Sequence, residues 1–129
     1  MPAAVEGALD ALRVLYLEDN AVIAMNFVAM LEEQGAIVAD HSTVVAALKA
    51  LRDGDYDVAL LDVDIRGATS FSVAEAALSK DVALVFVTGY GHETLPAPWR
   101  EYPLCEKPCS GSELSAAIQH AIATKDRAR

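Results

Sequence analysis

Short apolar segments alternate with longer amphipathic segments along the whole 129-residue chain, and this alternation limits the possible folds more than any other feature. Apolar segments such as 57–62 and 82–87 are apolar on both faces, which is typical of parallel strands that helices cover on both sides. The amphipathic segments carry apolar residues at helical spacing. The pattern predicts strands over 12–17, 36–39, 57–62, 82–87 and 102–105, and helices over 20–34, from Thr43, from Ser70 or Ser72 to Ser79, and from Ser110 or Ser112.

The predicted order is therefore a strand followed by a helix, repeated five times, with a degraded fourth helix. Pro96, Pro98 and Pro103 fall between residues 91 and 103 and exclude a long regular helix there. Because crossovers between parallel strands are right-handed, the pattern predicts a doubly wound (βα)5 sheet of the α/β class. We expect an N-terminal extension over residues 1–11, one domain over 12–124 and a basic C-terminal tail over 125–129.

Charge and composition exclude several classes of function. Acidic residues outnumber basic residues 19 to 10, and the net charge of −9 argues against binding to nucleic acid or to anionic membranes. No apolar run is long enough to span a bilayer and the first residues lack a signal-peptide pattern, so a soluble cytoplasmic protein is expected. Cys105 and Cys109 are interpreted as ordinary reduced thiols in preference to a redox pair or half of a zinc site.

Polar residues occupy the carboxyl ends of the expected strands, where doubly wound sheets place their functional sites. They are Glu18 and Asp19 after the first strand, Asp62 and Asp64 after the third, Thr88 after the fourth, and Lys107 after the fifth. Clustered carboxylates repel one another in a partly dehydrated cleft, and a divalent cation removes this repulsion. Mg²⁺ fits because it takes hard oxygen ligands from one or two carboxylates together with phosphate oxygens.

These residue types also indicate a reaction. A carboxylate beside Mg²⁺ can attack a phosphoryl group and form an acyl phosphate. The cation, the Lys107 ammonium and the Thr88 hydroxyl could each bind one phosphoryl oxygen. Phosphoryl transfer depends mostly on such positioning and charge neutralisation, so the strand ends predict phosphoryl-transfer chemistry.

Four segments together carry a family resemblance that covers about residues 12 to 123. They are VLYLEDN over 14–20, LLDVD over 60–64, VFVTG over 85–89 and EKP over 106–108. In these segments the chain resembles a single-domain response-regulator receiver of the CheY-like family. The resemblance implies a flavodoxin-like three-layer sandwich with parallel sheet order 2-1-3-4-5 and a short or irregular fourth helix.

The resemblance also implies a role for each residue at the strand ends. These roles are phosphoacceptor for Asp62, Mg²⁺ ligands for Glu18, Asp19, Asp62 and the backbone carbonyl of Asp64, switch hydroxyl for Thr88, and phosphoryl binding for Lys107. The bond between Lys107 and Pro108 is expected to be cis, an isomer that is accessible before proline.

A receiver of this kind implies partners and an output. The phosphoryl donor would be a sensor histidine kinase or a histidine phosphotransfer protein, and the chain would be no enzyme beyond its own phosphorylation and slow dephosphorylation. Since no output domain fits in the remaining residues, signalling is expected through protein–protein contact, or the chain acts as a phosphate sink. Residues 86–90 further resemble the FAT GUY subset of receivers, with Val87 in place of alanine, and this subset is associated with histidine kinases of the HWE type.

Two positions depart from the family pattern. Leu104 stands where the family often has a switch aromatic residue, and Tyr102 lies two residues earlier, on the same side of the expected strand. Arg66 replaces a proline that is common four residues after the phosphoacceptor, so the loop over 65–70 is expected to differ in shape.

Two other functions remain open on the residues alone. Asp62 and Asp64 resemble the nucleophile motif of haloacid-dehalogenase-type phosphatases, but that motif normally lies on an early strand and is followed by a substrate cap. The other alternative is a receiver-shaped scaffold that is never phosphorylated. The presence of the acidic pair together with Asp62, Thr88 and Lys107 argues against the scaffold.

Overall fold

Five parallel strands form one sheet in the computed structural model, which describes residues 7–89, 91 and 94–127. The strands are β1 (Arg13–Leu17), β2 (Ile37–His41), β3 (Val58–Asp62), β6 (Ala83–Thr88) and β7 (Leu104–Glu106). Their spatial order is β2-β1-β3-β6-β7, and every neighbouring pair is parallel. Counted along the chain, this is the expected order 2-1-3-4-5, and the doubly wound sheet is confirmed.

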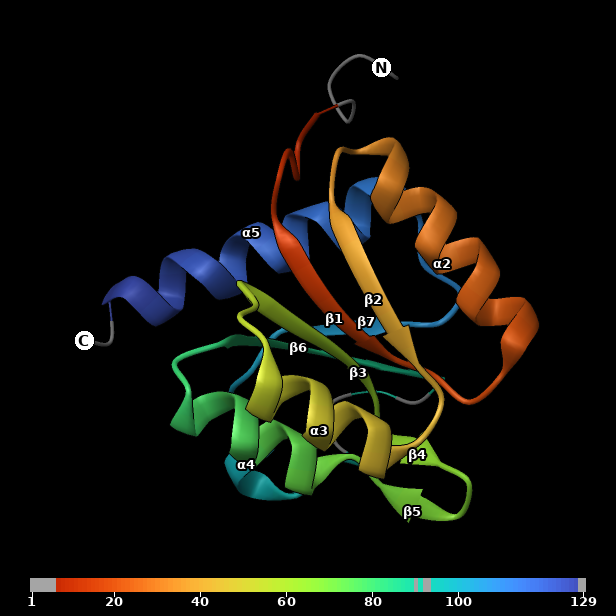
Figure 1. Ribbon diagram of the computed structural model, residues 1–129, viewed down its shortest axis with the longest axis vertical. Helices are drawn as coiled ribbons and strands as arrows, with labels where there is room; N and C mark the ends of the chain where they lie inside the picture. The colour runs from red at the N-terminus through yellow and green to blue at the C-terminus, as the bar shows by residue number, and fades with distance from the viewer. Residues whose placement is uncertain (1–6, 90, 92–93, 128–129) are drawn as a thin grey trace.

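Helices cover both faces of the sheet. They are α2 (Ala21–Glu33), α3 (Val44–Asp53), α4 (Phe71–Ser79) and α5 (Gly111–Arg127). Helices α3 and α4 lie on one face and α2 and α5 on the other, which gives the three layers of a flavodoxin-like fold (Figure 1). None of the helices in the described part of the chain is long and apolar enough to cross a membrane.

The stretch between β6 and β7 has no regular α-helix among its described residues. A short 3₁₀ helix, η2 (Ala97–Trp99), takes its place, as the prolines of this stretch predict. Residues 90, 92 and 93 of this stretch lie outside the described residues, as do 1–6 of the expected N-terminal extension and 128–129 of the expected tail. Residue 90 is also the last residue of the segment 86–90 that resembles the FAT GUY subset.

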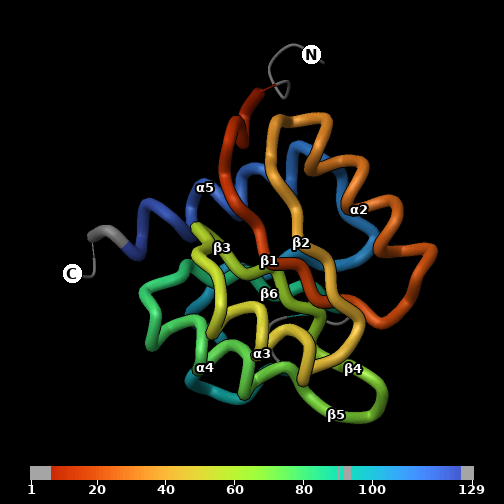
Figure 2. The backbone as a smooth tube through the Cα atoms, viewed as in Figure 1, coloured from red at the N-terminus to blue at the C-terminus, as the bar shows by residue number. Residues whose placement is uncertain are grey.

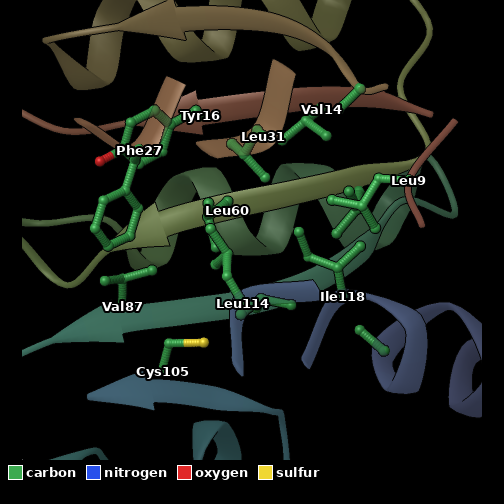
Figure 3. Close-up of a cluster of buried hydrophobic side chains, with 14 of the residues drawn as sticks. Leu9, Val14, Tyr16, Phe27, Leu31, Leu60, Val87, Cys105, Leu114 and Ile118 are labelled. Carbon is green, nitrogen blue, oxygen red and sulfur yellow. The ribbon is translucent and has the colours of Figure 1, made fainter. Parts of the chain in front are cut away.

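Side-chain alternation along the strands divides the core in two. On β1, Val14 and Tyr16 point into the core beneath α2 and α5, whereas Leu15 and Leu17 point into the core beneath α3 and α4. Figure 3 shows the first of these cores, with side chains from the sheet packed against Leu114 and Ile118 of α5. Leu9, from the expected N-terminal extension, is fully buried in the same core.

Local sequence signals set the helix ends. The Asn20 side chain accepts hydrogen bonds at the start of α2, Thr43 caps α3, and Gly35 has the left-handed φ of 95° expected after α2. At the start of α5, Glu113 N–H donates to the Ser110 hydroxyl at 3.1 Å and Ser110 N–H donates to Glu113 Oε1 at 2.8 Å. These reciprocal bonds form a capping box at the start of α5.

Other details differ from the sequence predictions. Strand β2 runs to His41, because it pairs with β1 as far as Leu17. Strand β7 begins at Leu104, since Tyr102 N–H donates to the Trp99 carbonyl at 3.2 Å and so continues the turn that follows η2. Between β3 and α4 the chain forms an unpredicted antiparallel hairpin of β4 (Asp64–Ile65) and β5 (Ala68–Thr69).

Candidate functional site

Strand register brings the predicted residues to one edge of the sheet. The pairing of β1 with β3 ends at Leu17 and Leu61, so the next residues, Glu18 and Asp62, are neighbours at the carboxyl end of the sheet. Asp62 and Cys105 both lie opposite Val87 of β6, one on each side. Lys107 comes two residues after Cys105, so its side chain lies on the same face of the sheet as those of Asp62 and Cys105.

Three carboxylates form a cluster at this edge. The side-chain oxygens of Glu18, Asp19 and Asp62 that could bind a cation lie within 4.8 Å of one another. Glu18 is 3% exposed and Asp62 is 7% exposed, whereas Asp19 is half-buried and lines a surface groove. A cation could therefore reach the cluster from the side of Asp19.

Lys107 holds two of these carboxylates together. Its ammonium donates to Glu18 Oε1 at 2.9 Å and to Asp62 Oδ2 at 3.0 Å. The Lys107 backbone N–H donates to the Thr88 carbonyl at 2.7 Å, which fixes the lysine backbone to the end of β6. The peptide bond between Lys107 and Pro108 is cis, as expected.

Burial and charge shift the protonation equilibria of this cluster. Burial raises the pKa of Asp62 from 3.8 to about 6, and the Glu18 charge adds to the increase, while the Lys107 ammonium opposes it. Burial would lower the pKa of Lys107, but its hydrogen bonds to Glu18 and Asp62 outweigh burial and raise that pKa. The lysine therefore stays charged and partly compensates two carboxylates that are costly to bury.

The β4–β5 hairpin provides a second contact to the cluster. Its turn residues, Arg66 and Gly67, have φ values of 51° and 82°, as in the type I′ turns that close two-residue hairpins. The Arg66 backbone N–H donates to Asp19 Oδ2 at 2.8 Å, and the Arg66 side chain donates to the Ser42 carbonyl at 3.3 Å. Figure 2 shows this hairpin at the same end of the molecule as the loop that joins β1 to α2. The loop over 65–70 thus has a defined shape that orients Asp19.

Two predicted site residues lie beside the cluster and not in it. Thr88 is buried at the end of β6, and its main chain contacts Lys107 as described above. Asp64 begins β4 with an exposed side chain, and among the described residues its carboxylate is not part of the group formed by Glu18, Asp19 and Asp62.

Sequence reasoning missed one hydrogen bond of Glu18 and the buried residue Tyr16 next to it on the same face. The Asn20 backbone N–H donates to Glu18 Oε2 at 3.1 Å, a bond that depends on loop geometry and has no sequence signal. Tyr16 lies two residues before Glu18 on β1 and therefore on the same face, and it is fully buried. The position of Tyr16 beside Glu18 could have been predicted from strand alternation alone.

Tyr102 and Leu104 lie on the same side of the sheet as each other, as predicted, and pack against the core beneath α3 and α4. The Tyr102 ring makes an edge contact with Phe86 at a centroid distance of 6.5 Å and a tilted contact with Trp99 at 5.8 Å. Trp99 also stacks on Phe71 at 5.6 Å. Trp99 and Tyr102, which follow β6, thus form a packed aromatic group with Phe71 of α4 and Phe86 of β6 rather than a single ring.

The donor set fits a magnesium ion. Three carboxylates supply hard oxygen atoms within 4.8 Å of one another. Two of these residues are buried, and the third, Asp19, is half-buried. Mg²⁺ takes such oxygens and keeps several waters, which the open side of the cluster would accommodate.

Comparison with known proteins identifies the fold. No family model and no curated protein matches the chain. A receiver domain protein from Clostridium thermocellum superimposes with a TM-score of 0.78 at 22% identity, covering 92% of this chain and 99% of its own. A response regulator receiver protein from Sinorhizobium medicae gives a TM-score of 0.76 at 20% identity, with coverage of 91% and 98%.

A third solved structure bears on the metal. It is the receiver domain of a sensor histidine kinase from Pseudomonas aeruginosa, with a TM-score of 0.73 at 21% identity and coverage of 88% of this chain and 98% of its own. That structure holds a magnesium ion coordinated in its active site cleft. The chain therefore has the fold of CheY-like response-regulator receiver domains, and its acidic cluster is a candidate Mg²⁺ site.

Proposed function

We propose that this chain is the phosphoacceptor receiver of a two-component system, phosphorylated on Asp62 in the presence of Mg²⁺. One observation carries the proposal: Lys107 bridges Glu18 and Asp62 at 2.9 and 3.0 Å, while Asp19 stands within the same carboxylate cluster. A packed structural ion pair would need one carboxylate for one lysine. Here one ammonium contacts two carboxylates of a cluster of three, which leaves negative charge for a divalent cation.

Each residue of the cluster has a defined task in this proposal. Asp62 attacks the phosphorus of a phosphohistidine, so that a bond forms between Asp62 and phosphorus while the bond from phosphorus to the histidine nitrogen breaks. Glu18, Asp19, Asp62 and the backbone carbonyl of Asp64 would hold Mg²⁺, which supplies charge neutralisation at the phosphoryl oxygens.

Lys107 and Thr88 would bind the transferred group. The Lys107 ammonium contacts Asp62 already, so a small movement of its flexible side chain takes it from the carboxylates to a phosphoryl oxygen. The Thr88 hydroxyl, at the end of the neighbouring strand β6, would donate to another phosphoryl oxygen. Because the backbones of these two residues are joined by a 2.7 Å hydrogen bond, movement at one position is passed to the other.

The surface beside the cluster supports a protein as the phosphoryl donor. A groove of about 540 Å³ begins at Glu18 and Asp19 and runs along α2. Met25 lines it and is 71% exposed, and Val22 on the same helix is 69% exposed. Exposed apolar side chains next to a reactive carboxylate suit the docking of an apolar helix face, as a histidine kinase or a phosphotransfer protein would present. The FAT GUY-like segment over 86–90 and the short η2 helix support a kinase of the HWE type.

Phosphorylation by a small donor tests the proposal. The protein is incubated with acetyl phosphate and Mg²⁺, and its mass is measured by intact-mass spectrometry. Wild type should gain one phosphoryl group, Asp62→Asn should gain none, and Asp55→Asn, which changes an exposed aspartate at the other end of β3, should behave as wild type. Wild-type protein that stays unmodified would support the scaffold alternative, and multiple turnovers of an external phosphomonoester would support a phosphatase.

A further inference from the structure

Tyr16 is an unusual residue for its position in the sheet. It lies on the central strand β1, is fully buried, and stacks on Phe27 of α2 with a centroid distance of 5.6 Å and an angle of 9° between the rings. The apolar part of the ring is thus well packed. A phenylalanine would satisfy the same packing, so the hydroxyl needs a separate explanation.

The Tyr16 hydroxyl points toward the acidic cluster. In Figure 3 its oxygen lies on the side of the ring that faces the carboxyl ends of the strands. The oxygen is buried, and within the described part of the chain it has no hydrogen-bond partner. A neutral tyrosine hydroxyl is a hydrogen-bond donor. A buried donor without an acceptor is unfavourable and rare in native proteins.

The Glu18 carboxylate lies two residues further along the chain on the same face as Tyr16, and each of its oxygens accepts one hydrogen bond from another group. Oε1 accepts from the Lys107 ammonium at 2.9 Å, and Oε2 accepts from the Asn20 backbone N–H at 3.1 Å. The Asn20 bond belongs to the backbone of the loop before α2. The Lys107 bond is made by a flexible side chain and is the one that can be exchanged.

We propose that Tyr16 is a positioning residue for the divalent-cation site, an inference that rests on the function proposed above. When Lys107 leaves Glu18 for a phosphoryl oxygen or is repelled by a bound cation, Glu18 Oε1 loses its donor. The Tyr16 hydroxyl then donates to the Glu18 carboxylate from the core side and holds it in place as a cation ligand. The same bond satisfies a hydroxyl that is otherwise buried without a partner.

Tyr16→Phe tests this role, because it removes the hydroxyl and keeps the ring. Mg²⁺ affinity is measured by isothermal titration calorimetry, and stability without Mg²⁺ is measured by thermal unfolding. Loss of a hydrogen bond to a metal ligand should weaken Mg²⁺ binding about ten-fold. Stability without Mg²⁺ should stay the same or increase, because the variant no longer buries an unpaired hydroxyl.

Phe27→Leu is the matched control. It removes the stacking partner and leaves the hydroxyl, so it should lower the unfolding temperature without a selective loss of Mg²⁺ affinity. A second measurement needs no variant: Mg²⁺ should shift the near-ultraviolet absorption of a tyrosine in the wild-type protein, as the environment of the hydroxyl changes. In Tyr16→Phe this shift should be absent.

The outcomes separate this inference from the proposed function. Wild type and Tyr16→Phe with equal Mg²⁺ affinity, or an absorption shift that persists in the variant, would overturn the role of Tyr16 and leave the receiver function standing. Wild-type protein that binds no Mg²⁺ would overturn both.

Discussion

Replacing Asp62 by asparagine should stabilise the protein when no divalent cation is present. Asp62 is 7% exposed, and burial raises its pKa from 3.8 to about 6. An acid whose pKa is higher in the folded than in the unfolded protein binds its proton more tightly when folded. Its ionisation therefore lowers the free energy of unfolding, and this loss develops as the pH rises from 3.8 to about 6.

The size of the effect follows from the pKa shift. A shift of about two units, at roughly 1.4 kcal/mol per unit, corresponds to about 3 kcal/mol at neutral pH. The Lys107 bond to Asp62 is already included, because it opposes the shift. Asp62→Asn should thus be more stable than wild type by up to about 3 kcal/mol at neutral pH and should lose this advantage below pH 3.8.

Urea unfolding in the presence of EDTA, followed by the fluorescence of Trp99, measures this difference. Trp99 is the single tryptophan and packs against Phe71 and Phe86, so its emission reports on folding. All other titrating groups are common to both proteins and largely cancel in the difference. An Asp62→Asn variant that is less stable than wild type at neutral pH, or a difference that does not change with pH, would refute the reasoning.

Three further changes test other parts of the structure. Gly35→Ala should lower the free energy of unfolding by about 2 kcal/mol or more, since φ is 95° and a Cβ would lie 2.8 Å from Asp10 Cα. Chemical unfolding measures this free energy, and an unchanged value would contradict the left-handed conformation of Gly35. Ser110→Ala should cost about 1 kcal/mol in the same assay through loss of the α5 cap, and no loss would argue against the capping box. Iodoacetamide should modify Cys109 in the folded protein and spare Cys105. A hydrogen bond from Cys105 lowers the pKa of Cys109, whereas Cys105 itself is only 5% exposed. Equal modification of the two cysteines in a peptide mass map would contradict this prediction.

Patterns that extend over whole elements made the fold predictable. Segments such as 58–62 and 83–88 are buried along their full length, and that burial requires apolar residues at every position except the last, where Asp62 and Thr88 belong to the site. The site could be predicted for the same reason. Once the strands are known to be parallel, their carboxyl ends meet at one edge, so Glu18, Asp62 and Lys107 must lie near one another.

Features that depend on one or two local contacts could not be predicted. The β4–β5 hairpin has Arg66 at a positive φ, a conformation that arginine does not signal, and its turn is held by the carboxylate of Asp19 from another loop. Leu9 is buried although it precedes the first strand, because its N–H donates to the Gln34 carbonyl at 2.9 Å. In both cases the deciding partner is distant in the sequence and has no periodic pattern.

The resting site contains two unfavourable features with one origin. Asp62 is ionised at neutral pH in a buried position, and the Tyr16 hydroxyl is buried without a partner in the described structure. Lys107 is involved in both, because one ammonium divided between two carboxylates neutralises neither fully, and because it donates to Glu18, the acceptor proposed for Tyr16. On the proposed function, a divalent cation would relieve both together by compensating the carboxylates and releasing Lys107. The well-packed sheet beneath the site supplies the stability that allows such a site to persist without the cation.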